Sequence, residues 1–270
     1  MPEVALSDSG AWVPARSPAG HDPGGLDGLS QSGRSGPLSR LARPYNRRVE
    51  PHARFRDLTV ATFVERLASG EPVPGGGSAA AIAGSLGAAL VAMVATLSEG
   101  RPKYAAHAAL IAEAGPAART LADQLLALAD EDAAAFAVYA TVMKMSRETD
   151  EEREARAAAL REAAKGASMV PFKTVEACYE VAVLAEALAG RSNRNASSDL
   201  EVAGLMAVAA ARSAAANVYI NLPSIGDPAM ERDLFRRTEE LADEIDRLAG
   251  HTRGVVRSGE AREPLARRDG

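Results

Sequence analysis

The feature that most limits how this chain can fold is the run Pro72-Val-Pro-Gly-Gly-Gly-Ser78, which leads directly into an uncharged segment. Prolines followed by consecutive glycines favour a loop whose backbone can approach a neighbour closely. Residues 79–97 carry no charge and are rich in Ala, Gly and small aliphatic side chains. This pattern predicts a central buried helix, with Ser78 at the position of its N-cap.

The same loop is a candidate binding site. A glycine-rich turn at a helix start presents backbone N–H groups and the positive end of the helix dipole, which suit an anionic or polar ligand. Its candidate ligand-binding residues are Gly75, Gly76, Gly77 and Ser78. A tight turn followed by a helix cap would use the same residues, so the pattern alone leaves the structural alternative open.

The rest of the ordered chain also reads as helix, because its apolar residues recur at helical spacing and no strand pattern appears. Pro116 should interrupt or bend one helix, and Pro171 should open or kink another. Capping boxes are expected at Thr149–Glu152 and Ser198–Glu201, and an N-cap at Asp57. The predicted helices cover about 58–69, 78–97, 104–145, 150–169, 171–189, 198–221 and 228–248. We therefore predict an all-α fold, an antiparallel helical bundle.

Three segments are expected along the chain. Residues 1–52 are rich in Gly, Ser, Pro and Arg without a sustained period, which predicts a disordered tail. Residues 53–258 should form the helical domain, and residues 259–270 a flexible C-terminus. Only 4% of the residues are aromatic, so the core should consist of Ala, Leu and Val.

Charge and cysteine content argue against several classes of protein. Residues 1–56 hold eight arginines against five acidic residues, so the remainder carries about −8, which disfavours a nucleic-acid partner. A single cysteine, Cys178, excludes an intramolecular disulfide, is expected to be buried, and fits a reducing cytoplasm. The four histidines lack metal-ligand spacing, so no metal is expected.

Residues 79–97 could span a bilayer, but their small side chains favour a core helix; residues 1–30 contain no signal peptide. We therefore expect a cytoplasmic protein with no membrane partner.

Asp132 is the residue that fits a plain bundle least well. It occupies an apolar seam between Leu128 and Ala135. Burial disfavours the charged form of a carboxyl group and raises its pKa. A carboxyl group with a pKa near neutrality can accept and donate protons, as general acid–base catalysis requires. A structural carboxylate held by neighbouring donors is the alternative.

Other polar residues are weaker candidates. Asn217 and Asn221 lie four residues apart and share one face of an apolar helix, where two amides could bind the edge of a heterocycle. An inter-helix hydrogen bond, or a helix C-cap for Asn221, would explain them equally well. The basic loop 191–195, which ends at Asn195, could hold a ligand carboxylate or be a solvated connection. Lys144 is a lone cation near a helix C-terminus.

Together these blocks resemble the cyclodeaminase/cyclohydrolase family over roughly residues 58–248. The most specific are PVPGGGSAAAIAG (72–84), DEDAAAF (130–136) and NVYINLPSI (217–225). The resemblance implies an all-helical homodimer that binds a folate in a cleft without a metal or other cofactor, with Asp132 as its catalytic aspartate. It also makes the three-glycine loop, Asn217, Asn221, Lys144 and Asn195 candidate substrate-binding residues. The chain reads VMKMS after Tyr139, where many relatives have Leu-Pro-Lys, and RSNRN in place of a Gly-Asn pair.

The resemblance implies a folate one-carbon enzyme, and two reactions fit it. One is hydrolysis of 5,10-methenyltetrahydrofolate to 10-formyltetrahydrofolate; the other is ring closure of formiminotetrahydrofolate with release of ammonia. The first is favoured because no formiminotransferase domain precedes this segment. A non-catalytic folate-binding helical module is a third possibility.

Overall fold

The computed structural model describes residues 54–260 and 263–265. The chain divides into two units, residues 1–49 and 50–270, and every described residue belongs to the second. The predicted tail, residues 1–52, lies outside the described residues.

The described residues form six α-helices and no strand, which confirms the all-α prediction. Short 3₁₀ turns precede or connect several of them. The α-helices are α1 (Val60–Leu67), α2 (Gly76–Ser98), α3 (Ala108–Met143), α4 (Asp150–Leu188), α5 (Ser197–Asn221) and α6 (Pro228–Ser258).

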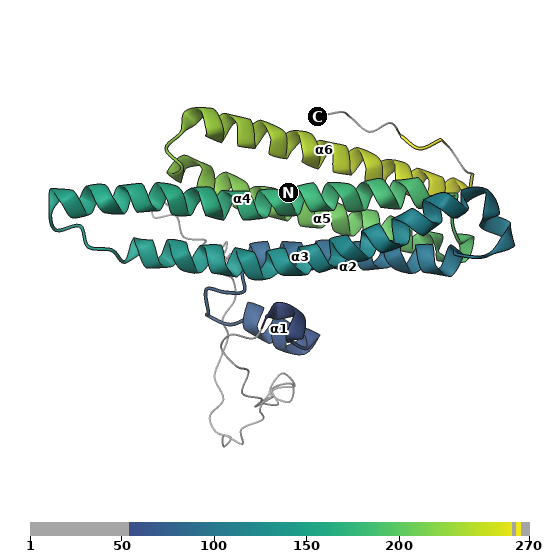
Figure 1. Ribbon diagram of the computed structural model, residues 1–270, viewed down its shortest axis with the longest axis horizontal. Coiled ribbons are helices and arrows are strands. Elements are labelled where there is room, and N and C mark those ends of the chain that lie inside the picture. Colours follow the sequence, from purple (N-terminus) through teal and green to yellow (C-terminus); the bar gives the residue numbers. More distant parts are fainter. Residues whose placement is uncertain (1–53, 261–262, 266–270) are drawn as a thin grey trace, which may run out of the picture. The chain divides into compact units, whose positions relative to one another are not determined.

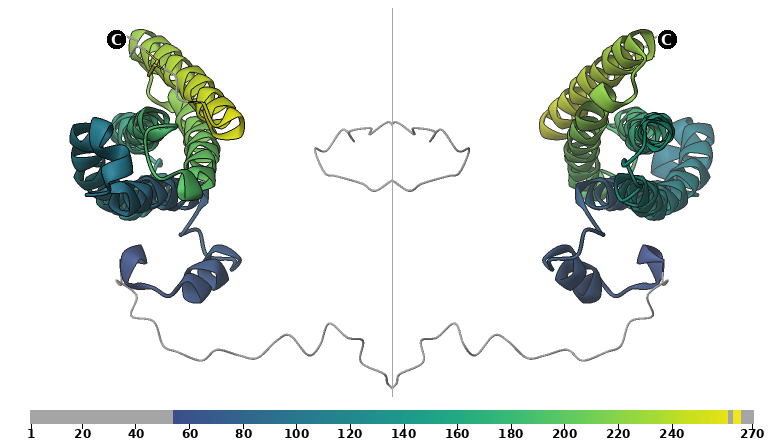
Figure 2. Two further views of the ribbon diagram at one scale, coloured as in Figure 1. Left: turned by 90° about the vertical axis from the view of Figure 1, so that its right-hand side faces the viewer. Right: turned by 90° about the vertical axis from the view of Figure 1, so that its left-hand side faces the viewer.

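The five long helices lie side by side as a bundle, and the short α1 stands beside them (Figure 1). Helix α2 packs against α3, α4 and α5, while α4 also contacts α3, α5 and α6. The end-on views show α2 and α3 on one side of the bundle and α6 at the opposite side (Figure 2). Helix α2 is therefore covered by three neighbours.

Small side chains let these neighbours approach α2 closely. A Cβ atom added at Gly84 would lie 2.9 Å from Sγ of Cys178, and one at Gly87 would lie 3.1 Å from the carbonyl oxygen of Ala203. Cys178 is fully buried, as predicted, and burial raises the pKa of its thiol to about 12. The core is built mainly from Ala, Val and Leu.

Two helix starts agree with the sequence prediction, and three predicted N-caps differ from it. Thr149 and Glu152 form the predicted capping box, and Asp227 caps α6 by accepting hydrogen bonds from two backbone N–H groups. The other three predicted caps are wrong, because the N-caps of α1, α2 and α5 are Thr59, Gly75 and Ala196 rather than Asp57, Ser78 and Ser198.

Pro171 lies within α4, which is a single helix of 39 residues, so of the two predicted alternatives, a helix start or a kink, the helix start is wrong. Proline lacks the N–H that would donate to the carbonyl oxygen of Ala167, four residues earlier. The side chain of Asn221 on α5 supplies that hydrogen bond, with Nδ2 3.1 Å from the Ala167 oxygen. An amide from a neighbouring helix thus replaces the missing backbone donor.

Candidate active site

Asp132 of α3 lies directly against the first turn of α2. The hydroxyl of Ser78 donates to Oδ2 of Asp132 at 2.9 Å. A Cβ added at Gly77 would lie 2.5 Å from Cγ of Asp132 and closer still to Oδ1. The structure therefore joins the three-glycine loop and the seam carboxylate into one site, although more than fifty residues separate them in the sequence.

This setting changes the acidity of Asp132. Removal of the side chain from water raises its pKa above the ordinary value of 3.8, and hydrogen bonds from the Ser78 hydroxyl and backbone N–H oppose that rise. The adjacent acids face elsewhere: Asp130 accepts from the backbone N–H of Phe55 at 2.8 Å, and Glu131 lies 3.9 Å from Nζ of Lys173. Asp132 is thus the member of this acidic run that contacts the glycine loop and has a raised pKa, a combination that often occurs at functional sites.

Asn217 also borders the loop. A Cβ added at Gly76 would lie 3.7 Å from Nδ2 of Asn217, and this Nδ2 donates to the carbonyl oxygen of Ser213 at 2.9 Å. Among the described residues, Oδ1 of Asn217 has no hydrogen-bond partner. The side chain therefore offers one acceptor beside the start of α2.

The side-chain amide of Asn221 makes hydrogen bonds within the helical bundle. Its Nδ2 donates both to Ala167 on α4 and to the backbone oxygen of Asn217 at 2.8 Å. The inter-helix hydrogen bond that the sequence left open as an alternative is therefore present. Its amide donors serve the backbone of α4 and α5.

Two predicted binding residues, Lys144 and Asn195, lie far from Asp132 in this chain. Lys144 is exposed just beyond the end of α3, twelve residues from Asp132, which corresponds to about 18 Å along a helix. Asn195 precedes α5 and lies about 30 Å along it from Asn217. Its loop packs at the other end of the bundle, where the backbone N–H of Asn193 donates to Ser98 at 2.7 Å. Within the loop, Arg191, Ser192 and Asn193 are buried, whereas Arg194 and Asn195 are exposed, so only its last two residues fit a solvated connection.

The sequence did not predict what Ser78 does. The side chain of an N-cap serine accepts a hydrogen bond from the backbone of its own helix. Ser78 is instead fully buried, and its hydroxyl is within hydrogen-bond distance of a carbonyl oxygen of α3. A signal was present in the spacing: Ser78 and Ser85 lie seven residues apart on one face of an apolar helix, and both donate to carbonyl oxygens of α3. Buried serines at such spacing indicate contacts between helices.

A hollow of about 670 Å³ opens beside the loop, between α1 and α3. Val73 of the loop and Asp130 and Ala133 of α3, which flank the catalytic candidate in sequence, line it.

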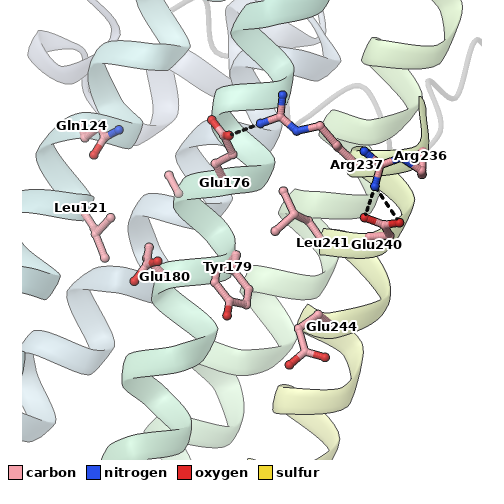
Figure 3. A pocket seen from close by; sticks show the side chains of 11 residues that line it. Leu121, Gln124, Glu176, Tyr179, Glu180, Arg236, Arg237, Glu240, Leu241 and Glu244 are labelled. Atoms are coloured by element: carbon pink, nitrogen blue, oxygen red, sulfur yellow. Dashed lines mark hydrogen bonds and ion pairs between the residues drawn. The ribbon is translucent and has the colours of Figure 1, made fainter. Parts of the chain in front are cut away.

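Another hollow, of about 700 Å³, lies between α3, α4 and α6, where Arg237 pairs with Glu176 and Arg236 pairs with Glu240 (Figure 3). This second hollow contains none of the predicted site residues. No group of three or more His, Cys, Asp or Glu among residues 54–260 and 263–265 is arranged to hold a metal ion.

Comparison with known proteins finds relatives that cover most of this chain. A methenyltetrahydrofolate cyclohydrolase of Methylorubrum extorquens is 40% identical over 200 residues, which are 74% of this chain and 96% of that protein. A formimidoyltransferase-cyclodeaminase of Mus musculus is 32% identical over 206 residues, which are 76% of this chain but only 38% of that longer protein.

The fold has a solved counterpart. The crystal structure of a formiminotetrahydrofolate cyclodeaminase from Thermotoga maritima superposes with a TM-score of 0.66 at 26% identity, covering 75% of this chain and 98% of that one. A model of the family described as formiminotransferase-cyclodeaminase matches residues 59–240. The chain therefore belongs to the formiminotransferase-cyclodeaminase family.

Proposed function

We propose that this protein hydrolyses 5,10-methenyltetrahydrofolate to 10-formyltetrahydrofolate, with Asp132 as the general acid and base. The observation that carries the proposal is the contact between the Asp132 carboxylate and the first turn of α2, where burial raises its pKa. The similarity to a cyclohydrolase along nearly that protein's full length favours this reaction.

A single carboxyl group with a raised pKa can carry out the proton transfers between the attacking water and N5 in this reaction. Water adds to the methenyl carbon between N5 and N10, and Asp132 takes a proton from the attacking water. The bond from carbon to N5 then breaks, and Asp132 returns the proton to N5. The remaining hydroxyl proton leaves to solvent as the formyl C=O forms on N10. A group that must be a base in one step and an acid in the next works best with a pKa near the working pH.

The loop supplies a second element. In the part of the chain that the structure describes, no side chain caps α2, and the N–H groups of Gly76 and Gly77 in its first turn have no partner within the helix. We propose that these donors and Oδ1 of Asn217 hold polar atoms of the folate beside Asp132. Since Asp132 itself supplies the proton transfer, the proposed reaction uses no resident cofactor.

The alternative reaction is cyclodeamination of formiminotetrahydrofolate. There N10 attacks the formimino carbon, and Asp132 protonates the amino group that leaves as ammonia. The likeness to the cyclodeaminase from Thermotoga maritima favours this candidate. Purified protein assayed in parallel for loss of methenyl absorbance and for ammonia release distinguishes the two reactions, and binding of folate without either turnover would identify a non-catalytic module.

The test of the assigned residue is Asp132→Asn, with Glu131→Gln as the matched control on the neighbouring, exposed position. We expect Asp132→Asn to lower kcat by about 100-fold or more while the circular dichroism spectrum is unchanged. Glu131→Gln should retain activity. If Asp132→Asn keeps most of the wild-type rate, the assignment is wrong.

We further propose that the protein acts as a soluble, cytoplasmic homodimer. Helices α2 and α5 pack together and both leave apolar side chains exposed, including Leu86 at 52%, Leu205 at 52% and Ile220 at 77%. Stretches containing α2 and α5 are apolar and long enough to cross a membrane, but core helices of soluble proteins meet the same criterion. A second copy packed on this α2/α5 face would cover an apolar surface that water otherwise contacts.

A further inference from the structure

The hydroxyl of Ser78 has two acceptors within reach. Its Oγ lies 2.9 Å from Oδ2 of Asp132 and 3.1 Å from the carbonyl oxygen of Ala129. A serine hydroxyl carries a single hydrogen and two lone pairs. It therefore donates to one of these oxygens at a time, and water cannot supply another partner because Ser78 is fully buried.

Both acceptors are held in place by the same helix. Ala129 and Asp132 lie three residues apart on α3, and the Ala129 carbonyl belongs to the interior of that helix. A backbone carbonyl has two lone pairs, so it can serve the helix and Ser78 together. The hydrogen of Ser78 can consequently turn from one acceptor to the other by rotation about the Cβ–Oγ bond alone.

The charge on Asp132 decides which acceptor is used. An ionised carboxylate is the stronger acceptor, so the hydroxyl then donates to Oδ2. When Oδ2 carries a proton, Asp132 becomes a donor and the lone pair of Ser78 accepts from it. The hydrogen of Ser78 then points to the Ala129 oxygen.

We propose that Ser78 is a positioning residue that keeps its hydrogen bond to Asp132 in both protonation states by turning its hydrogen between Asp132 and Ala129. The catalytic meaning of this device rests on the proposed function, in which Asp132 takes up and returns one proton per turnover. A partner that serves both forms lets the carboxyl group change charge without moving, and such preorganisation lowers the barrier to proton transfer.

The chain contains a matched control for this contact. Ser85 lies seven residues farther along α2, is also buried, and donates to the carbonyl oxygen of Ala122 on α3 at 2.9 Å. Among residues 54–260 and 263–265, no carboxylate is a partner of Ser85. Ser85→Ala therefore removes the same kind of inter-helix hydrogen bond without touching the ionisable group.

The first experiment measures the pKa of Asp132 directly, by NMR titration of protein labelled with ¹³C at the aspartate carboxyl carbons, with Asp132→Asn identifying the resonance. We expect the pKa to rise in Ser78→Ala, because the ionised form loses a donor, and to stay at the wild-type value in Ser85→Ala. If Ser78→Ala does not fold, Ser78→Cys, with its weaker thiol donor, should give a rise in the same direction. An unchanged pKa in the Ser78 variant, or an equal rise in Ser85→Ala, overturns the inference.

The second experiment asks whether the contact persists in both states. Crystal structures of the wild type at pH values below and above the titration midpoint should keep Oγ of Ser78 within hydrogen-bond distance of Oδ2 of Asp132. Separation of these atoms in the acidic form would overturn the proposal.

Steady-state kinetics then test whether the hydrogen bond between Ser78 and Asp132 affects turnover. We expect Ser78→Ala to lower kcat about ten-fold with little change in KM, and to move the acidic limb of the pH–rate profile to higher pH. Ser85→Ala should leave that limb in place. If the wild type converts neither folate substrate, the proposed function fails, but the NMR titration still decides whether Ser78 is coupled to Asp132.

Discussion

A side chain at residue 77 cannot coexist with Asp132 where the structure places it. A Cβ at Gly77 would lie 2.5 Å from Cγ of Asp132 and 2.8 Å from its Oδ2. Real Cβ atoms almost never approach other atoms closer than 3.0 Å. The third glycine of the loop is therefore needed for clearance of the carboxylate, and the helical conformation of this residue does not itself require glycine.

Gly77→Ala should consequently displace the Asp132 carboxyl group and impair catalysis. A shift of about 1 Å in a reacting group lowers rates about 100-fold, and we expect a loss of that size in kcat/KM. Steady-state kinetics on the methenyl substrate, with circular dichroism to verify folding, measure it. Retention of wild-type kcat/KM would contradict the observed contact.

Gly166→Ala is the matched control. Gly166 also lies within a helix, α4, but a Cβ there would meet no atom of the described residues within 4 Å. Because alanine is the better helix former, this change should leave activity intact and stabilise the fold by about 0.5–1 kcal/mol.

Much of the fold could be predicted from the sequence because helical periodicity is a local signal. On α6, Leu234, Leu241, Ile245 and Leu248 recur at helical spacing; Leu241 is partly buried and the other three are buried, and many small residues of α2 lie in the core. A new helix does not start at Pro171, and the reason is non-local: the donor to the Ala167 oxygen comes from Asn221, fifty residues after the proline. Local rules cannot include such a partner.

Part of the candidate site could also be predicted from local signals in the sequence. Asp132 stood out because a charge on an apolar seam is visible in one helix, and it does meet the glycine loop. The role of Ser78 depended on which helix faces α2, so its contact with Asp132 was not predicted. Lys144 and Asn195 were assigned from their place in the sequence, but α3 and α5 are long enough to carry them far from Asp132.

The raised pKa of Asp132 makes a prediction about stability. Between the unfolded pKa and the higher folded pKa, the folded state binds more protons, so stability falls as pH rises through that window. Above the folded pKa, Asp132 is ionised in both the folded and the unfolded state, and its destabilising effect on the folded state has reached its full size. Asp132→Asn removes this charge and should raise the thermal midpoint at pH 8 but have little effect at pH 3. An Asp132→Asn protein that is less stable than wild type at pH 8 would contradict the desolvation of this group.

The pairing of Asn221 with the Pro171 region predicts a coupling between two substitutions. Asn221→Ala leaves the Ala167 carbonyl oxygen without its donor and should lower the free energy of unfolding by about 1 kcal/mol. In a Pro171→Ala background the backbone N–H of residue 171 restores that donor, so the same substitution should have a smaller effect. Chemical denaturation of the four proteins of this double-mutant cycle measures the difference. Additive effects would show that Asn221 does not compensate for the proline.

The proposed dimer predicts that charge on the α2/α5 face separates the subunits. Leu86→Glu and Leu205→Glu each place a carboxylate on an apolar surface that a second copy would cover, where an unpaired charge is strongly unfavourable. Val138→Glu is the control, because Val138 is similarly exposed, at 56%, but lies on α3. Sedimentation velocity should show a dimer for wild type and Val138→Glu, and a monomer for the two other variants. A wild-type monomer, or dimers in all four proteins, would exclude this face as the interface. Because Asn217 and Ile220 lie within one turn of each other on α5, dissociation should also disturb the region beside the glycine loop and lower kcat/KM at low protein concentration.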